Sequence, residues 1–195
     1  MILKIKFILQ QIISYCVGIE MNFVKNLDVH STVKFLNKPE VLIHSKAKIK
    51  IEENCTINSS NHGYHLNMHN KVKLYADRAN ALIEIGKNTR VNGACIHAFK
   101  KISIGQNCLI AANCQVIDAN GHKLMMDSPE KRINSTDEGK EITIYDNVWI
   151  GANCIILGGT TIGEGAIITA GSVVKGLVPS RAIYGGNPGK VLKQY

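Results

Sequence analysis

An unbroken six-residue repeat near the C-terminus constrains the fold more than any other feature of the chain. Aliphatic residues recur at every sixth position: Ile144, Ile150, Ile156, Ile162, Ile168 and Val174. A small or branched residue follows four positions after each of the first five: Val148, Cys154, Thr160, Ala166 and Ser172. A period of six fits neither an amphipathic helix at 3.6 nor a strand at 2. It predicts a solenoid in which each hexad is a short strand and a bend, with the aliphatic side chain inward and the small residue at the bend.

The same frame covers most of the chain, with two interruptions. It begins at Ile43, breaks over residues 58–80, resumes at Ile85 and continues to Val116. The next position of the frame is occupied by His122 instead of an aliphatic residue, and a polar stretch without periodicity follows. A long loop therefore leaves the coil at this histidine, and long excursions from a rigid scaffold often carry function.

The sequence thus predicts an all-β solenoid preceded by a helical segment. The expected parts are an N-terminal helical or irregular segment over 1–38, a β-helix over 39–178 with loops at 58–80 and 117–143, and a C-terminal tail over 179–195 that closes the open end of the coil.

Composition narrows the expected partners. The net charge is +8 over 195 residues, and the lysines and arginines are scattered rather than gathered in one block. No aromatic-basic stacking motif accompanies them, so anionic metabolites are expected in place of nucleic acid. The apolar stretch from Phe7 to Ile19 is too short to span a membrane and has no signal-peptide cleavage site. It is expected to be a docked helix, with a membrane-surface helix as the alternative.

Five of the six cysteines follow an aliphatic residue by four positions, which is the small-residue slot of the frame: Cys55, Cys95, Cys108, Cys114 and Cys154. They are expected to be small buried hydrophobes rather than disulfides, nucleophiles or metal ligands. Free thiols in this number favour a reducing compartment, hence the cytoplasm.

Three segments carry a family resemblance: SIGQNCLIAANCQVIDANGHK, TIYDNVWIGANCIILGGTTIGEGAIITAGSVV and VPSRAIYGGNPGKVL. With them the chain resembles the hexapeptide-repeat acyltransferases, close to the galactoside, maltose and xenobiotic acetyltransferases and to capsular polysaccharide O-acetyltransferases. The resemblance is strong over residues 81–192, weaker over 39–57 and absent from the first 38. It implies a left-handed parallel β-helix, a homotrimer, acetyl-CoA as the donor, no metal, and active sites between subunits. Periodicity gives no hand, and a left-handed crossover departs from the usual right-handed rule, so the hand rests on the resemblance.

Two residues match the positions at which this family handles its acceptor. His122 in NGHK matches the general base, which takes the proton of a sugar hydroxyl as the oxygen attacks the thioester. An imidazole suits this role because it changes charge near neutral pH. Asn92 in RVNGAC matches an asparagine that faces the acceptor, while a bend residue at a coil corner is the alternative.

Four further residues match the donor positions of the family. Trp149 in NVWIG matches a tryptophan lining the cleft, Ala152 and Ala170 match positions whose main-chain amides hold the pantetheine arm, and Lys190 in NPGK matches a basic residue near the nucleotide phosphates. A packed bend residue is the alternative for Trp149, and a solvated tail residue for Lys190. One departure is that Lys175 follows AGSVV directly, where the family often has Thr-Lys.

The leading hypothesis is an acetyl-CoA-dependent acetyltransferase acting on a sugar hydroxyl in capsule or lipopolysaccharide synthesis, located in the cytoplasm or at the inner face of the membrane. N-acetylation of an amino sugar nucleotide is the second. A zinc enzyme of the γ-carbonic-anhydrase type is the third, but it needs histidines from neighbouring rungs, whereas His62, His65 and His69 crowd in one loop. A non-catalytic β-helical scaffold is the fourth, and the histidine at the broken frame argues against it.

Overall fold

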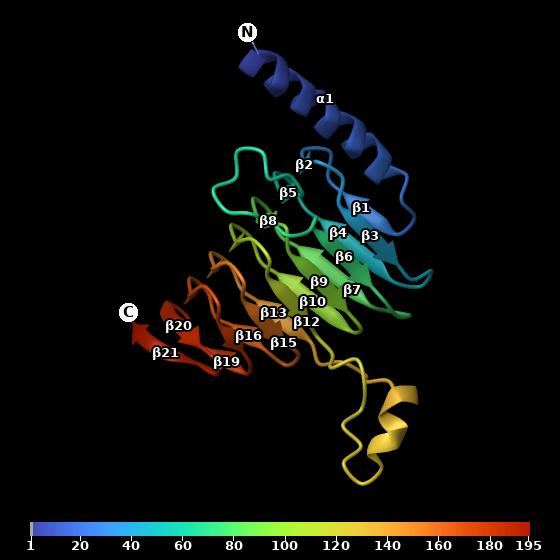
Figure 1. The fold of residues 1–195 in the computed structure, drawn as a ribbon, viewed down its shortest axis with the longest axis vertical. Helices are drawn as coiled ribbons and strands as arrows, with labels where there is room; N and C mark the ends of the chain where they lie inside the picture. Colours follow the sequence, from blue (N-terminus) through green and yellow to red (C-terminus); the bar gives the residue numbers. More distant parts are fainter. Residues whose placement is uncertain (1) are drawn as a thin grey trace.

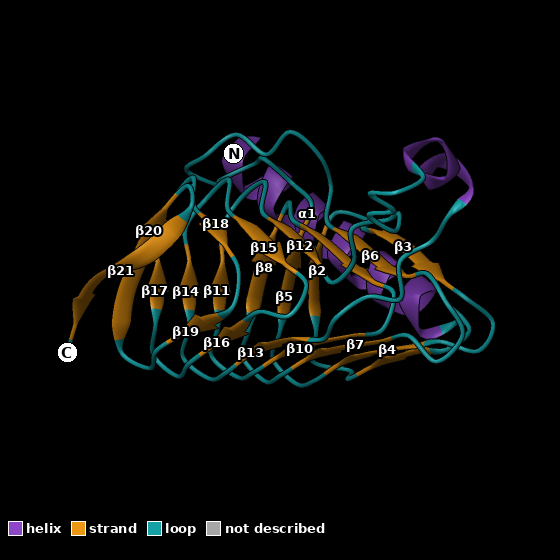
Figure 2. Ribbon diagram, turned by 90° about the horizontal axis from the view of Figure 1, so that it is seen from below, coloured by secondary structure: helices purple, strands orange, loops and turns teal. Residues whose placement is uncertain are grey.

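The computed structural model describes residues 2–195, with side chains from residue 8 onward. The helix α1 (Ile2–Asn22) is followed by a coil of parallel strands that stack in three sheets around one core (Figure 1). The 3₁₀ helix η1 (Pro129–Asn134) lies in a loop that stands away from the coil (Figure 2). Among the described helices, none is long and apolar enough to cross a membrane.

Three sheets form the sides of the coil. Sheet one contains β1 (Leu27–Val29), β4 (Lys48–Ile51), β7 (Leu82–Ile85), β10 (Lys101–Ile104), β13 (Ile142–Ile144), β16 (Thr161–Ile162) and β19 (Leu177–Val178). Sheet two contains β2 (Lys34–Leu36), β5 (Thr56–Asn58), β8 (Arg90–Asn92), β11 (Leu109–Ile110), β14 (Trp149–Ile150), β17 (Ile167–Ile168), β20 (Ala182–Gly186) and β21 (Gly189–Gln194). Sheet three contains β3 (Glu40–Ile43), β6 (Lys73–Ala76), β9 (Cys95–Ala98), β12 (Gln115–Ile117), β15 (Ile155–Leu157) and β18 (Val173–Val174).

The chain visits the three sheets in the same order in every coil. It passes from sheet one to sheet two, from two to three, and then returns to sheet one of the next coil. The turns between sheets two and three are called the two–three corner below, and the turns from sheet three back to sheet one are called the three–one corner. Strands of successive coils pair in parallel, so residues at equivalent positions stack along the axis.

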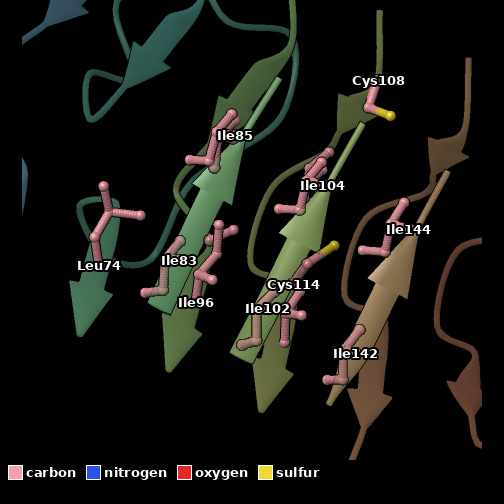
Figure 3. Close-up of a cluster of buried hydrophobic side chains, with 14 of the residues drawn as sticks. Leu74, Ile83, Ile85, Ile96, Ile102, Ile104, Cys108, Cys114, Ile142 and Ile144 are labelled. Carbon is pink, nitrogen blue, oxygen red and sulfur yellow. The ribbon is translucent and has the colours of Figure 1, made fainter. Parts of the chain in front are cut away.

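The hexad prediction is confirmed in the core. The six aliphatic residues of the C-terminal frame are at most 1% exposed, and the small residues four positions later are also buried. Register explains the stacking, because Ile144 pairs with Ile162 and Ile150 pairs with Ile168. Figure 3 shows the same inward rows in earlier coils. The predicted fold class, a β-helix with an N-terminal helix, is therefore correct.

Asparagines form many of the bends between sheets one and two. Asn88, Asn107 and Asn147 adopt left-handed backbone conformations, with φ of 57°, 55° and 61°. Their side chains form a ladder in which each amide donates to the next carbonyl oxygen, over 3.1 Å from Asn88 to Asn107 and 3.2 Å from Asn107 to Asn147. Asparagine tolerates this conformation better than most residues, and the ladder links successive coils at the bend.

The structure corrects the predicted limits of the coil. The first coil begins at Leu27 rather than at residue 39, because β1 pairs with β4 and β2 pairs with β5. Val29, Phe35 and Val41 keep the six-residue interval and pair with Ile51, Ile57 and Leu74, so the repeat starts one coil earlier than predicted. At the other end β20 pairs with β17, so the coil extends beyond residue 178 before β21 closes it as an antiparallel hairpin.

The two excursions are shorter than predicted. The first covers residues 59–72, between β5 and β6, because the strand Lys73–Ala76 lies inside the stretch expected to be a loop. The second covers residues 118–141, between β12 and β13. The first leaves at the two–three corner and the second at the three–one corner, so they emerge on opposite edges of sheet three.

The prediction for the cysteines holds for four of the five and is wrong for Cys95. Cys55, Cys108, Cys114 and Cys154 are buried, and burial raises the pKa of the Cys55 thiol to about 11. Cys95 begins β9 on the outer face of sheet three and is only partly buried. The frame is one residue short at this point, so Ala94 takes the buried corner position and the next side chain turns outward.

Candidate active site

Four of the predicted site residues lie at or beside the two–three corner. Asn92 ends β8, and Ala152 and Ala170 lie in the turns after β14 and β17. Lys190 is in β21, opposite Gly185 of β20 and exposed. Because the coils stack in register, these positions form a column along the axis. A long ligand that crosses several coils would follow this column.

The main-chain amides at this corner are available to a ligand. Within residues 2–195, the N–H groups of Ala152 and Ala170 donate to no carbonyl or side chain of the protein, and Ala170 is exposed. The column is narrow because Gly151 packs directly on the next coil, where a Cβ would lie 2.6 Å from the Ala170 nitrogen. Unpaired donors on a rigid turn suit the carbonyl groups of an extended arm.

Trp149 lies on the outer face of sheet two, beside this column. It is 51% exposed, and its register partners are Leu109 in the preceding coil and Ile167 in the next. Leu109 is 44% exposed, so the three side chains form an apolar strip on the outside of the coil. The structure therefore does not place Trp149 in a packed bend, which was the alternative to a ligand-facing role.

Asn92 is held firmly in the column. Its Oδ1 accepts a hydrogen bond of 3.1 Å from Asn58 Nδ2, and its own Nδ2 donates over 2.9 Å to the Ile110 carbonyl. One N–H of the amide remains for another acceptor. The sharp bend itself is made by Gly93, with φ of 49°, so Asn92 is not required by the turn conformation.

A hollow of about 850 Å³ lies next to Asn92, between the 59–72 excursion and the outer face of sheet three. Its lining includes Met68 and His69 from the excursion, and Lys73, Cys95 and Gln115 from the sheet. The lining is mainly amide, amine and hydroxyl groups, with a salt bridge of 3.2 Å from Lys73 to Glu40. Such a polar hollow suits a hydroxylated ligand better than an apolar one.

His122 lies on the second excursion, where two chain segments run side by side as a stalk. Its Nδ1 lies 3.0 Å from the Ser135 carbonyl oxygen, and the Lys123 amide donates to Ser135 Oγ. Lower in the stalk, Asp137 Oδ2 accepts hydrogen bonds from the Asn120 main chain and side chain. A carbonyl oxygen accepts only, so in the neutral ring Nδ1 carries the proton and Nε2 presents a lone pair. His122 itself is exposed.

The base of this excursion is fixed by Asp118, which sequence reasoning missed. Its carboxylate is buried and accepts three main-chain hydrogen bonds of 2.7–2.9 Å from Phe99, Lys100 and Lys101. Burial raises the pKa of this carboxyl, while the three N–H groups act in the opposite direction. No signal in the sequence marks this contact, because the partners belong to the preceding coil.

The structure does not bring all predicted site residues together within one chain. Asn92, Ala152, Ala170 and Lys190 follow the two–three corner, whereas His122 is carried by an excursion from the three–one corner. Sheet three lies between them, and three or four strand residues span roughly 10–13 Å. The exposed tip of the excursion carries Leu124, Met126 and Ile133, which are 68%, 76% and 78% exposed.

The histidines of the first excursion do not assemble a metal site. Among residues 2–195, no group of three histidine, cysteine, aspartate or glutamate side chains is arranged to hold a metal ion. His62, His65 and His69 are all exposed.

Comparison with protein families matches two parts of the coil. The model of the bacterial transferase hexapeptide, comprising six repeats, matches residues 141–176. The model of the hexapeptide repeat of succinyl-transferase matches residues 101–120. WbbJ of Escherichia coli (strain K12), whose proposed role is O-acetyl transfer in lipopolysaccharide biosynthesis, is 32% identical over 120 residues. These are 58% of this chain and 61% of that protein, and the chain spans about half to three fifths of the curated relatives it matches.

Solved structures show the same coil. A hexapeptide-repeat acetyltransferase of Vibrio cholerae, solved with acetyl coenzyme A, is 34% identical with a TM-score of 0.53, over 57% of this chain and 60% of that one. The polySia-specific acetyltransferase NeuO has a TM-score of 0.71 over 86% of this chain and 71% of that one, and at 24% identity this likeness shows the fold alone. Residues 101–120 and 141–176 therefore carry hexapeptide repeats of the transferase type, and the coil of this chain is similar to those of hexapeptide-repeat acetyltransferases.

Proposed function

We propose that the protein is an acetyl-CoA-dependent O-acetyltransferase that modifies a sugar hydroxyl during synthesis of a surface polysaccharide. The observation that carries the proposal is the fixed tautomer of His122, whose Nε2 is free on an exposed excursion. The role of WbbJ in lipopolysaccharide biosynthesis and the acetyl coenzyme A bound to the Vibrio cholerae structure support the acceptor and the donor.

The two–three corner offers groups that would bind the donor, acetyl-CoA. The unpaired amides of Ala152 and Ala170 would hold the carbonyl groups of the pantetheine arm, and the apolar strip at Trp149 would cover one side of it. The exposed amine of Lys190 lies at the C-terminal end of this column, where it would face the phosphates. The thioester then points toward Asn92 at the other end. The remaining side-chain N–H of Asn92 would stabilise the negative charge that forms on the thioester oxygen.

The reaction needs one base and no covalent intermediate on the protein. His122 Nε2 takes the proton of the acceptor hydroxyl as its oxygen bonds to the carbonyl carbon. Collapse of the tetrahedral intermediate breaks the carbon–sulfur bond, and the imidazolium returns the proton to the leaving thiolate. The products are the acetyl ester and coenzyme A. The hydrogen bond from Nδ1 to Ser135 holds the ring in the tautomer that this sequence of steps requires.

The separation of the two corners favours a shared site. His122 of one copy would meet the two–three corner of another, because sheet three separates the two within a chain. The exposed Leu124, Met126 and Ile133 would be covered by that second copy. A closed ring of copies supplies every site in this way, and a homotrimer is the assembly we propose.

The hollow beneath the first excursion would hold the acceptor. It opens next to Asn92 and presents mainly polar groups, as a saccharide requires. The six cysteines are free, which fits the reducing cytoplasm where acetyl-CoA is made available to such enzymes.

The test is acetyl transfer to a defined acceptor. The purified protein is incubated with acetyl-CoA and a panel of saccharides, amino sugar nucleotides and polysaccharide repeat units, and the products are analysed by mass spectrometry. We expect an alkali-labile O-acetyl ester on one sugar class. An alkali-stable amide on an amino sugar would replace O-acetylation by N-acetylation, and no transfer to any saccharide would overturn the proposal.

A further inference from the structure

The helix α1 packs on the first coil through its C-terminal half. A hollow of about 510 Å³ separates the helix from residues 29–35 of the first coil, and its lining from the helix is mixed, with Gln11 and Ser14 beside Tyr15 and Ile19. Val17 and Met21, near the end of the helix, are buried against that coil. Among the described helix residues before Val17, none belongs to the buried core.

The apolar side of α1 faces solvent. Ile8, Leu9 and Ile12 are 57%, 56% and 53% exposed, and Phe23 just beyond the helix is 84% exposed. Ile8 and Ile12 are one turn apart and therefore lie on the same side of the helix. Figure 1 shows the N-terminal part of the helix extending beyond the first coil, so nothing in the described chain covers this stripe.

The positive charge of the protein is concentrated at the same end. Residues 1–50 contain eight lysines against three acidic residues, so five of the eight net positive charges fall in this first quarter of the chain. Glu20 pairs with Lys38 and Asp28 with Lys48, which leaves six lysines against one carboxylate in these residues and the net charge unchanged. An exposed apolar stripe on a segment with a net charge of +5 matches the chemistry of an anionic lipid surface.

We propose that the outer side of α1 docks the protein on an anionic membrane surface, with the stripe of Ile8, Leu9 and Ile12 at the acyl boundary and the lysines among the headgroups. The inference is independent of acetyl transfer, since α1 lies at the opposite end of the coil from Lys190.

Vesicle flotation tests the docking. The probe is vesicles of phosphatidylglycerol and phosphatidylethanolamine, with pure phosphatidylcholine vesicles for comparison. We expect the protein to float with the anionic vesicles and to be released as salt is raised. The double variant Ile8→Glu with Ile12→Glu should lower the partition coefficient about tenfold or more, because it removes two apolar side chains from the bilayer boundary.

The matched control keeps the charge change and moves it to the polar side of the same helix turn. Gln10→Glu with Gln11→Glu should retain binding within about threefold of the native protein, because only screened charge is altered. Equal binding of the two double variants, or no binding of the native protein to anionic vesicles, would overturn the proposal. So would a changed oligomeric mass of the Ile8 and Ile12 variant in lipid-free light scattering, since that result assigns the stripe to contacts between copies.

Discussion

The two excursions from the coil differ in what holds them. Residues 59–72 fold back on their own chain, where Asn113 accepts a hydrogen bond of 2.9 Å from the His69 amide and donates one of 3.1 Å to the Asn67 carbonyl. Residues 118–141 stand off the coil and are held mainly along their own stalk and at its base (Figure 1). The first excursion forms the wall of a hollow. The second carries an exposed histidine on its stalk and exposed apolar side chains at its tip.

This difference indicates how the proposed site is divided. An excursion satisfied by its own coil can shape a binding hollow within one chain. An excursion with a fixed base and an exposed apolar tip gains its contacts from another molecule. The predictions below test whether the folded-back excursion binds and the projecting one reacts.

The largest effect is expected at the histidine of the projecting excursion. His122→Ala should lower kcat by about 10²–10⁴, because the hydroxyl then lacks its base. His62→Ala, an exposed histidine of the folded-back excursion, is the matched control and should keep near-normal kcat. Steady-state kinetics with the identified acceptor measures kcat of both variants. Similar losses of kcat in the two would show that His122 has no special role as the base.

Mixed oligomers should show that the projecting excursion works on a second copy. Ala170→Trp would block the donor column, and neither this variant nor His122→Ala should be active alone. Random co-assembly should restore about a quarter of the sites, because each site then combines an intact corner from one copy with an intact histidine from another. Activity that stays at the mean of the two separate variants would show that each chain contains its own complete site.

The floor beneath the folded-back excursion contains two cysteines of unlike burial. Cys114→Ser should lower the free energy of unfolding by about 1–3 kcal/mol, because the thiol is fully buried in the core. Cys95→Ser, on the outer face at the hollow, should change it by less than about 0.5 kcal/mol. Urea denaturation measures both. Equal costs would mean that Cys95 is packed as tightly as the core residues.

The fold of the first excursion should depend on one side chain. Asn113→Gly keeps a backbone with φ of 64° but removes the two hydrogen bonds that hold the excursion, so local opening should become easier by about 1–2 kcal/mol. Asn153→Gly is the matched control, since φ there is 58° and, unlike Asn113, its side chain has no hydrogen bond to the excursion among the described residues. Hydrogen exchange of residues 61–72 reports the opening. Unchanged exchange protection after Asn113→Gly would show that these two hydrogen bonds do not hold the excursion on the coil.

The smallest effect is expected at the far end of the donor column. Lys190→Glu should raise KM for acetyl-CoA by about 3–10-fold at low salt and less at high salt, because the charge is exposed and screened. KM for the acceptor should hardly move. Lys46→Glu, an exposed lysine of the first coil, makes the same charge change as a control. If Lys190→Glu changed KM for acetyl-CoA and KM for the acceptor by the same factor, coenzyme A would not bind with its phosphates at Lys190.

The repeat predicted the coil well where the hexads are regular and poorly where they are not. From Ile144 to Val174 every inward residue follows from spacing alone, because each coil repeats the same three bends. The first coil keeps the interval with Val29, Phe35 and Val41, but it was not predicted because an aromatic residue takes the aliphatic position and the two valines are only partly buried. Cys95 was assigned to the wrong side for a different reason: the frame is one residue short between Val91 and Ile96, which reverses the direction in which the side chain points.

The sequence by itself determined the solenoid, its core rows and the point at which His122 interrupts them, because these depend on local periodicity. The tertiary structure decided three further matters: that Ser135 selects the His122 tautomer, that Asp118 fixes the base of its excursion, and that His122 and Asn92 lie at different corners of the coil. Such contacts join residues separated by a loop or a whole coil. Their partners are set by the angle at which each strand leaves a corner, and a spacing pattern along one chain contains no information on that angle.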